Sequence, residues 1–507
     1  MPRFLRLLLL AAPLAWGQCP ANASLASPAA GPSWNGWGSD ASNSRFQSAE
    51  AAQLPAAQVP QLKLKWAFGF PGVRSVLGQP SVAGGRVYIG VDTGSVYSLS
   101  AATGCMYWSF KADAGVRTAV TVAPSGVIFG DLKANVYLVN AETGELIWKI
   151  HVDDHPSARI TGAPKVFENR AYVPVASGEE GGGGNANYAC CTFRGSVVAL
   201  DLATGKQIWK TYTIAEAPKQ VGRNLNGVLR WAPAGAGVWN SPTIDPKRRA
   251  LYIGTGDAYT SPAAATTDSI VAMDLDSGKI LWSVQDTEGD TWLAGCNGAK
   301  LPENCPAQLG PDHDFGASPI LETLPDGRTL LIAGQKSGNV WAHDPDKKGA
   351  VVWKTPLVAN TTEFGGKIIW GGAADGQNAY FGLGTGGIAA VQLRDGEKQW
   401  FTALQPAAAV AAHTGQDGPL TAIPGIVFSG GWDGVLRALS TPNGRVVWEY
   451  NTVQDYQTVN GVAAKGGSMG APGPVVSGGM LLAPSGYIGV KNGLPGNVLL
   501  AFAAPAP

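Results

Sequence analysis

Charged residues are scarce in this 507-residue chain, since Asp, Glu, Lys and Arg make up only 15% of it, against about 25% in an average globular protein. The 37 basic residues balance the 37 acidic ones, so the chain lacks the excess positive charge with which proteins bind nucleic-acid backbones. Apolar residues still form 45% of the chain, which excludes disorder driven by charge and polarity. The composition therefore predicts a folded protein with no nucleic-acid partner.

The common histidine and cysteine motifs are also missing. The five histidines contain no HExxH pair, which excludes the helical zinc site of metalloproteases. The six cysteines contain no CxxC and no CxxCH, so the sequence has no attachment site for a covalent c-type haem.

The N-terminus has the composition of an export signal. Arg3 and Arg6 precede the apolar run 7–14, and residues 15–17 (AWG) form a small-x-small cleavage site. This pattern predicts a signal peptide over residues 1–17, with a buried N-terminal helix as the alternative. No later stretch is apolar enough over a sufficient length for a membrane helix. We therefore expect a periplasmic or secreted protein with no membrane span, in which cysteines can pair.

A short motif recurs along the chain and ends in tryptophan each time. Its four clear copies are residues 101–108 (AATGCMYW), 141–148 (AETGELIW), 202–209 (LATGKQIW) and 275–282 (LDSGKILW), and degenerate copies end at Trp353, Trp400 and Trp448. Each copy follows an alternating apolar run and precedes another, as expected for a hairpin with a glycine-containing turn. Two further short strands lie upstream of each copy. Four strands in roughly 40 to 70 residues are typical of a β-propeller blade.

The ends of the chain fit together as one more blade. Seven turn-and-tryptophan units are complete, and an eighth tryptophan, Trp66, has no strands of its own before it. Residues 496–502 form a strand that lacks a tryptophan strand after it. We therefore predict an all-β, eight-bladed propeller over residues 61–507, after an N-terminal extension over residues 18–60. One blade would take its outermost strand from the N-terminus and its other three from the C-terminus, which leaves few open sheet edges.

Four long insertions interrupt the regular spacing of the tryptophans. They cover residues 178–187, 216–237, 258–268 and 286–314. Such loops on a rigid scaffold are where functional residues usually lie.

Several segments outside the repeat resemble the quinoprotein alcohol dehydrogenases, and most of all their polyvinyl-alcohol dehydrogenase branch. The segments are 34–38 (WNGWG), 66–71 (WAFGFP), 113–118 (DAGVRT), 190–195 (CCTFRG), 314–319 (DFGASP), 333–338 (AGQKSG) and 458–467 (TVNGVAAKGG). The resemblance implies an enzyme that oxidises alcohols, secondary or polymeric ones included, to carbonyls by base-assisted hydride transfer to pyrroloquinoline quinone. Haem-containing members carry a CxxCH domain. Since this sequence has no such motif, the electrons are expected to leave to a separate carrier such as a cytochrome c.

The quinone is flat and carries three carboxylates, so its site needs an aromatic floor, cationic and hydroxyl contacts, and an oxygen-bound divalent cation. By resemblance, Trp239 is the floor. Arg117, Thr161 and Lys336 are the expected contacts to the quinone, because a buried cation without an anion is costly. Arg159 and Gln79 are weaker candidates, and Trp370 is expected either beside the cavity or packed in the core.

The resemblance also implies a catalytic base and a set of metal ligands. Asp290 matches an Asp-x-Trp stretch and is expected to take the alcohol proton and to bind the cation. Glu180 and Asp257 are the other expected ligands, with Glu179 as a competitor to Glu180. Relatives that use a lanthanide have a second aspartate two residues after the base, where this chain has Trp292, so the resemblance implies Ca²⁺.

The adjacent residues Cys190 and Cys191 are expected to form a disulfide with each other, with free thiols or bridges to other cysteines as alternatives. In methanol-oxidising relatives such a pair covers the quinone, but from a different loop, so a contact of this pair with the quinone stays open. Cys296 and Cys305 lie in one loop and are expected to bridge, which leaves Cys19 for Cys105.

A second hypothesis is a non-catalytic propeller that serves as a scaffold for protein assembly in the cell envelope. The two hypotheses differ in the need for a central cluster of polar residues, which a scaffold has no cause to keep. The expected cluster is Arg117, Thr161, Glu180, Trp239, Asp257, Asp290 and Lys336.

Overall fold

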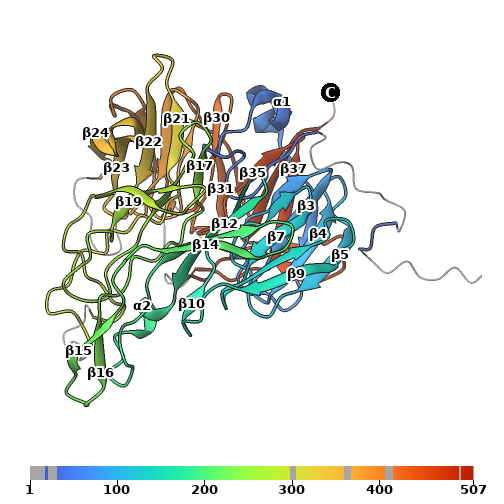
Figure 1. Cartoon of the computed structure of the whole chain (residues 1–507). Helices are drawn as coiled ribbons and strands as arrows, with labels where there is room; N and C mark the ends of the chain where they lie inside the picture. The colour runs from blue at the N-terminus through green and yellow to red at the C-terminus, as the bar shows by residue number, and fades with distance from the viewer. Residues whose placement is uncertain are drawn as a thin grey trace, which may run out of the picture.

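The computed structural model describes residues 17–20, 31–296, 304–358, 367–405, 415–489 and 493–505. The expected signal peptide lies, apart from its last residue, outside the described residues. Eight antiparallel sheets follow one another along the described chain and form the predicted eight-bladed propeller (Figure 1). Within the described residues, no helix has the length and apolar character needed to cross a membrane.

Each of the first seven blades is a run of four consecutive strands, the innermost first. The first blade contains β2 (Ser81–Ala83), β3 (Arg86–Gly90), β4 (Ser95–Ser100) and β5 (Met106–Lys111), and the second contains β6 (Thr121–Ala123), β7 (Gly126–Gly130), β8 (Asn135–Val139) and β9 (Leu146–His151). The third contains β11 (Lys165–Phe167), β12 (Arg170–Ser177), β13 (Ser196–Asp201) and β14 (Gln207–Tyr212). The fourth contains β17 (Thr243–Asp245), β18 (Ala250–Gly254), β19 (Ser269–Asp274) and β20 (Ile280–Gln285). The next three are β21 (Ile320–Thr323), β22 (Thr329–Gly334), β23 (Asn339–Asp344) and β24 (Ala350–Pro356); β25 (Ala373–Ala374), β26 (Asn378–Gly382), β27 (Ile388–Gln392) and β28 (Lys398–Thr402); and β29 (Thr421–Ile423), β30 (Ile426–Gly430), β31 (Val435–Ser440) and β32 (Val446–Asn451).

The eighth blade joins the two ends of the chain as predicted. Its strands are β35 (Val475–Ser477), β36 (Met480–Ser485), β37 (Val498–Ala503) and, outermost, β1 (Lys63–Gly69). The pairing of β1 with β37 runs from Lys63 opposite Ala503 to Gly69 opposite Val498. Hydrogen bonds between the N-terminal and C-terminal strands therefore close the ring.

The repeat tryptophans hold neighbouring blades together. The indole N–H of Trp108 donates to the carbonyl of Ala141 in the next blade (3.1 Å), and Trp209 donates in the same way to Leu275 (3.2 Å). The ring of Trp108 also lies directly against Gly144, in the turn of that next blade. The same packing of a tryptophan on a glycine occurs at six more seams, as we call the contacts between neighbouring blades. The tryptophans at these seams are Trp66, Trp148, Trp209, Trp282, Trp353 and Trp400. The repeat is thus structural, with each tryptophan burying its face between two sheets.

The segment from Trp34 to Gln47 contacts the innermost strand of every blade, so the expected extension is part of the ring. It exchanges backbone hydrogen bonds with Val82 and side-chain bonds with Val122 and Lys165. The amides of Ile244, Leu321, Ala374 and Ala422 then donate to successive carbonyls of this segment, and Gln47 donates to Val476. Its buried Arg45 stacks on Trp34 and Trp37. We call residues 34–47 the axial segment.

The long insertions build a wall on one side of the ring. They contain α2 (Glu179–Gly182) and the hairpin of β15 (Lys219–Arg223) and β16 (Leu229–Ala232), which projects beyond the blades (Figure 1). Isolated bridges link Arg194 to Gly235, Gly235 to Ala258 and Ala258 to Thr291, so the insertions support one another. The remaining elements are α1 (Ala49–Ala52), η1 (Ala56–Gln61), η2 (Pro345–Lys347), β10 (Ala158–Arg159), β33 (Asp455–Tyr456) and β34 (Ala464–Lys465).

The three expected disulfides are confirmed. Cys19 bonds to Cys105 and ties the N-terminus to the first blade, and Cys296 bonds to Cys305 within one insertion. Cys190 and Cys191 bond to each other.

The seams give a direct test of the repeat. In Gly144→Ala the new Cβ would lie 2.7 Å from the Trp108 ring, at a backbone φ of +77°. Overpacking and the left-handed backbone together should cost about 2 to 4 kcal/mol, measured as a lower midpoint of thermal or denaturant unfolding. Gly85→Ala is the control, because Gly85 has a φ of +75° with nothing within 4 Å. An equal loss in both variants would show that the backbone, and not the tryptophan contact, carries the effect.

Candidate active site

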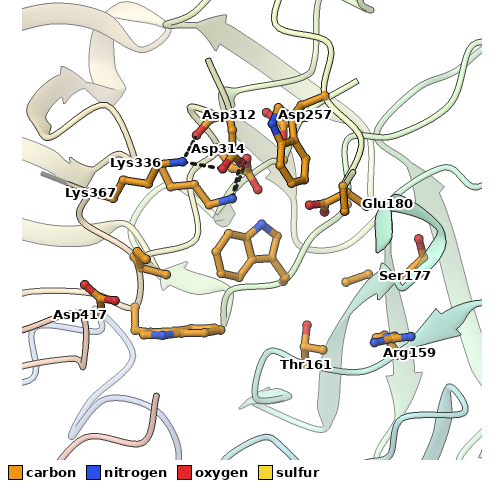
Figure 2. A pocket seen from close by; sticks show the side chains of 18 of the residues that line it. Arg159, Thr161, Ser177, Glu180, Asp257, Asp312, Asp314, Lys336, Lys367 and Asp417 are labelled. Carbon is orange, nitrogen blue, oxygen red and sulfur yellow. Dashed lines mark hydrogen bonds and ion pairs between the residues drawn. The ribbon is translucent and has the colours of Figure 1, made fainter. Parts of the chain in front are cut away.

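A cavity of about 520 Å³ lies on the axis, where the loops before the innermost strands meet the insertions of the third and fourth blades. Six of the seven residues of the expected cluster line it, and they are Arg117, Thr161, Glu180, Trp239, Asp257 and Lys336. Figure 2 shows Asp257, Asp312, Asp314 and Lys336 on one side and Arg159 and Thr161 on the other. The cavity is therefore divided into a carboxylate side and a cationic side.

The cationic side carries two arginines from adjacent loops, Arg117 and Arg159. Burial, and next the charge of Arg117, lower the pKa of Arg159. The buried Nε of Arg159 and Oγ1 of Thr161 have no hydrogen-bond partner among the described residues. Since buried polar groups are normally paired, this side is suited to an anionic ligand. The weaker candidate Gln79 lies elsewhere, because it bonds to Arg45 and to the carbonyls of Gly36 and Trp37 in the axial segment.

Two tryptophans form the aromatic part of the cavity. Trp239 meets Trp370 edge to face, with ring centroids 5.2 Å apart, which places Trp370 in the lining. The Trp239 ring passes so close to Gly316 that a Cβ there would come within 1.9 Å of it. Lys336 Nζ lies 5.2 Å from the Trp239 centroid, and the Arg117 guanidinium lies 4.5 Å from that of Trp370. The site can therefore hold a flat, negatively charged molecule against an indole.

Of the two neighbouring glutamates, only Glu180 lines the cavity. The carboxylate of Glu179 accepts hydrogen bonds from the amides of Thr192 (3.0 Å) and Phe193 (2.8 Å) and from the Tyr188 hydroxyl (2.9 Å). Burial raises the pKa of Glu180 to about 7, with Lys336 acting in the opposite direction. Glu180 is therefore the glutamate available to a ligand, whereas Glu179 anchors the 190–195 loop.

An ion-pair chain crosses the carboxylate side. Lys336 Nζ lies 2.6 Å from Asp312 and 3.1 Å from Asp314, and Lys367 Nζ lies 2.5 Å from the other oxygen of Asp312. Burial alone would lower the pKa of Lys336, but Asp312 and Asp314 outweigh it and raise this pKa above its usual value. Asp257 is buried beside this chain, and neither of its carboxylate oxygens has a partner among the described residues.

Asp290, which the sequence suggested as base and ligand, lies apart from the cavity lining. It is fully buried, and its carboxylate accepts the amides of Asp312 (3.3 Å) and His313 (2.8 Å). Burial raises its pKa to about 6. Its carboxylate thus supports the backbone of the loop that presents Asp312 and Asp314. From the same insertion, Asp312 and Asp314 line the cavity instead, and the sequence analysis named neither as a site residue although the segment of Asp314 carried part of the resemblance.

The disulfide of Cys190 and Cys191 also lies outside the lining. Both cysteines are buried in an apolar cluster with Leu293 and Cys296. Cys190 pairs with Arg230 of the projecting hairpin through their backbones. In this structure the pair therefore packs the wall of insertions.

Comparison with known proteins agrees with this geometry. The family model described as "Glucose/ethanol/alcohol dehydrogenase, beta-propeller domain" matches residues 34–294. A second model, "Outer membrane protein assembly factor BamB", matches residues 336–471. Among solved structures, the quinohemoprotein alcohol dehydrogenase from Comamonas testosteroni superposes with a TM-score of 0.70 at 19% identity, over 94% of this chain and 81% of that one. At this identity the likeness shows the fold.

Curated relatives extend the match to nearly the whole chain. A polyvinylalcohol dehydrogenase from Pseudomonas sp is 40% identical over 92% of this chain and 76% of its own length. Another, from Sphingopyxis sp. (strain 113P3), is 37% identical over 97% of this chain and 79% of its own length. These relatives do not favour the scaffold hypothesis. The chain belongs to the pyrroloquinoline quinone-type dehydrogenases, with polyvinyl-alcohol dehydrogenases among its homologues.

Proposed function

We propose that this protein is an exported alcohol dehydrogenase that uses pyrroloquinoline quinone and Ca²⁺ and acts on secondary or polymeric alcohols. The observation that carries the proposal is one cavity with an indole floor, two arginines on one side and unpartnered buried carboxylates on the other. The polymeric substrate follows from the relatives described as polyvinylalcohol dehydrogenases. We propose a cytochrome c as the carrier that takes the electrons.

The chain's own side chains fit the quinone. Trp239 supplies the stacking face, and Arg117, Arg159 and Thr161 supply donors for its carboxylates. When bound, the quinone would supply the group that accepts the hydride, and with it two electrons, from the alcohol carbon, with a carbonyl polarised by the cation. Glu180 and Asp257 would hold that cation through oxygen ligands, as Ca²⁺ prefers.

Asp314 replaces Asp290 as the proposed base. It lines the cavity and is only 2% exposed. Its Oδ1 lies 3.1 Å from Lys336 Nζ, and a carboxylate held at this place can accept the hydroxyl proton. Two residues after Asp314 the chain has Gly316, so the implied preference for Ca²⁺ holds for the new assignment as well.

The two aspartates can be separated by substitution. Asp314→Asn should lower kcat about 100-fold or more, because a positioned base contributes that much. Asp290→Asn should keep most turnover. Turnover is measured as dye reduction with alcohols after reconstitution with quinone and Ca²⁺, and the bound quinone and Ca²⁺ are quantified in each variant. Normal turnover in Asp314→Asn together with its loss in Asp290→Asn would return the role to Asp290.

The role of the cationic side in quinone binding can be tested independently. Arg159→Met should weaken quinone binding about 10- to 100-fold, because charge-assisted hydrogen bonds are worth about 1.5 to 3 kcal/mol. Quenching of tryptophan fluorescence during a quinone titration measures this. Arg328→Met is the matched control, since Arg328 lies on the surface and pairs with Asp326. Unchanged affinity in Arg159→Met would remove this arginine from the site.

A further inference from the structure

A third aspartate, Asp268, lies behind the carboxylate side of the cavity. It closes the 258–268 insertion, just before β19, and is fully buried without being part of the cavity lining. Single carboxylate oxygens of Asp257, Asp268 and Asp314 lie within 4.8 Å of one another. The three come from two separate insertions, so the fold brings them together from distant positions in the sequence.

The carboxylates of this cluster outnumber the cations and hydrogen-bond donors that lie beside them. Both oxygens of Asp257 and both of Asp268 are without a hydrogen-bond partner among the described residues, whereas Oδ1 of Asp314 pairs with Lys336. The nearest cation, Lys336, is 3.1 Å from Asp314 and is shared with Asp312. Burying several unpaired carboxylates side by side is very unfavourable, so the cluster needs a positive charge between them.

The backbone holds Asp268 in place. Its amide donates to Gly256 (3.2 Å), and its carbonyl accepts the amide of Asp286 (3.1 Å). Its φ is +50°, a left-handed conformation that non-glycine residues adopt rarely. The main chain is thus bonded on both sides, while the carboxylate lies beside those of Asp257 and Asp314.

We propose that Asp268 is a ligand of the resident cation in addition to Glu180 and Asp257, so that these three protein carboxylates bind Ca²⁺ before the quinone arrives. This inference rests on the proposed function, to which it adds a ligand and an order of assembly. Asp257 and Asp314 line the cavity and Asp268 lies behind them. The cation is therefore held from the protein side, and it offers its remaining positions to the cavity. Charge count is a main determinant of Ca²⁺ affinity, so removal of this carboxylate should weaken the site.

The test uses full-length protein prepared without quinone and stripped with a chelator. Calorimetric titration with CaCl₂ should show about one bound ion in the wild type and at least 10-fold weaker affinity in Asp268→Asn. Asp290→Asn is the matched control, since it also removes one buried charge beside the cluster, but from a carboxylate bonded to two backbone amides. Its affinity should stay within about 3-fold of the wild type.

Three results would overturn the inference: no Ca²⁺ binding to the quinone-free wild type, equal affinity in Asp268→Asn, or an equal loss in Asp290→Asn. If Asp268→Asn does not fold, the wild type decides, because CaCl₂ alone must raise its unfolding temperature. If the wild type reduces dye with quinone and Ca²⁺ but gives one of these Ca²⁺-binding results, only the role of Asp268 as a ligand is refuted. If the wild type does not bind quinone, the proposed function is refuted.

Discussion

The contact between a repeat tryptophan and a glycine of the next blade, which recurs for seven of the eight repeat tryptophans, is the constraint on which the rest of the structure depends. It fixes the distance between neighbouring sheets, since the indole ring fills the space that any side chain at the glycine would need. Hydrogen bonds from the indoles to carbonyls of the next blade fix the position of one sheet relative to the other along the seam. Because these contacts near the rim hold the blades together, the inner loops are not needed for packing between blades and can carry polar groups on the axis.

The axial segment links this scaffold to the site. Residues 34–47 touch all eight innermost strands, and Trp37 lies next to Trp239 and Trp370 in a small space beneath the main cavity. Arg45 donates to Leu420, Gln79 and Thr421 as well as to Trp37. These bonds run to several blades at once. The floor under the indole is therefore built by a segment that also ties the ring together, and its rigidity should limit movement of Trp239.

The propeller could be predicted because its signals repeat: hairpin, glycine turn and tryptophan recur at similar spacing, and the two incomplete ends matched. Arg117, Thr161, Trp239 and Lys336 were assigned by resemblance to the quinoprotein alcohol dehydrogenases, and all four line the cavity. The axial segment has no repeat period, and its course could not be predicted.

The position of Asp290 outside the cavity lining could not be predicted for a related reason. The insertion 286–314 contains Asp286, Asp290, Asp312 and Asp314, and spacing alone does not tell which of them faces inward. Backbone amides bind Asp290 and leave Asp314 exposed to the cavity, a matter of loop geometry. Asp268 was missed because nothing in its local sequence distinguishes it from a turn residue.

The charged residues of the cavity contrast with the low charge content of the whole chain. With 15% charged residues overall, the cavity and the cluster behind it nevertheless collect two arginines, two lysines and six carboxylates. Each side alone is unfavourable, because like charges are buried together there. A ligand with carboxylates at one end and a cation at the other satisfies both sides at once. The burial of like charges on each side is therefore the basis of the cavity's selectivity. A neutral flat molecule would compensate the charges of neither side, and an anion without a cation would compensate those of only one.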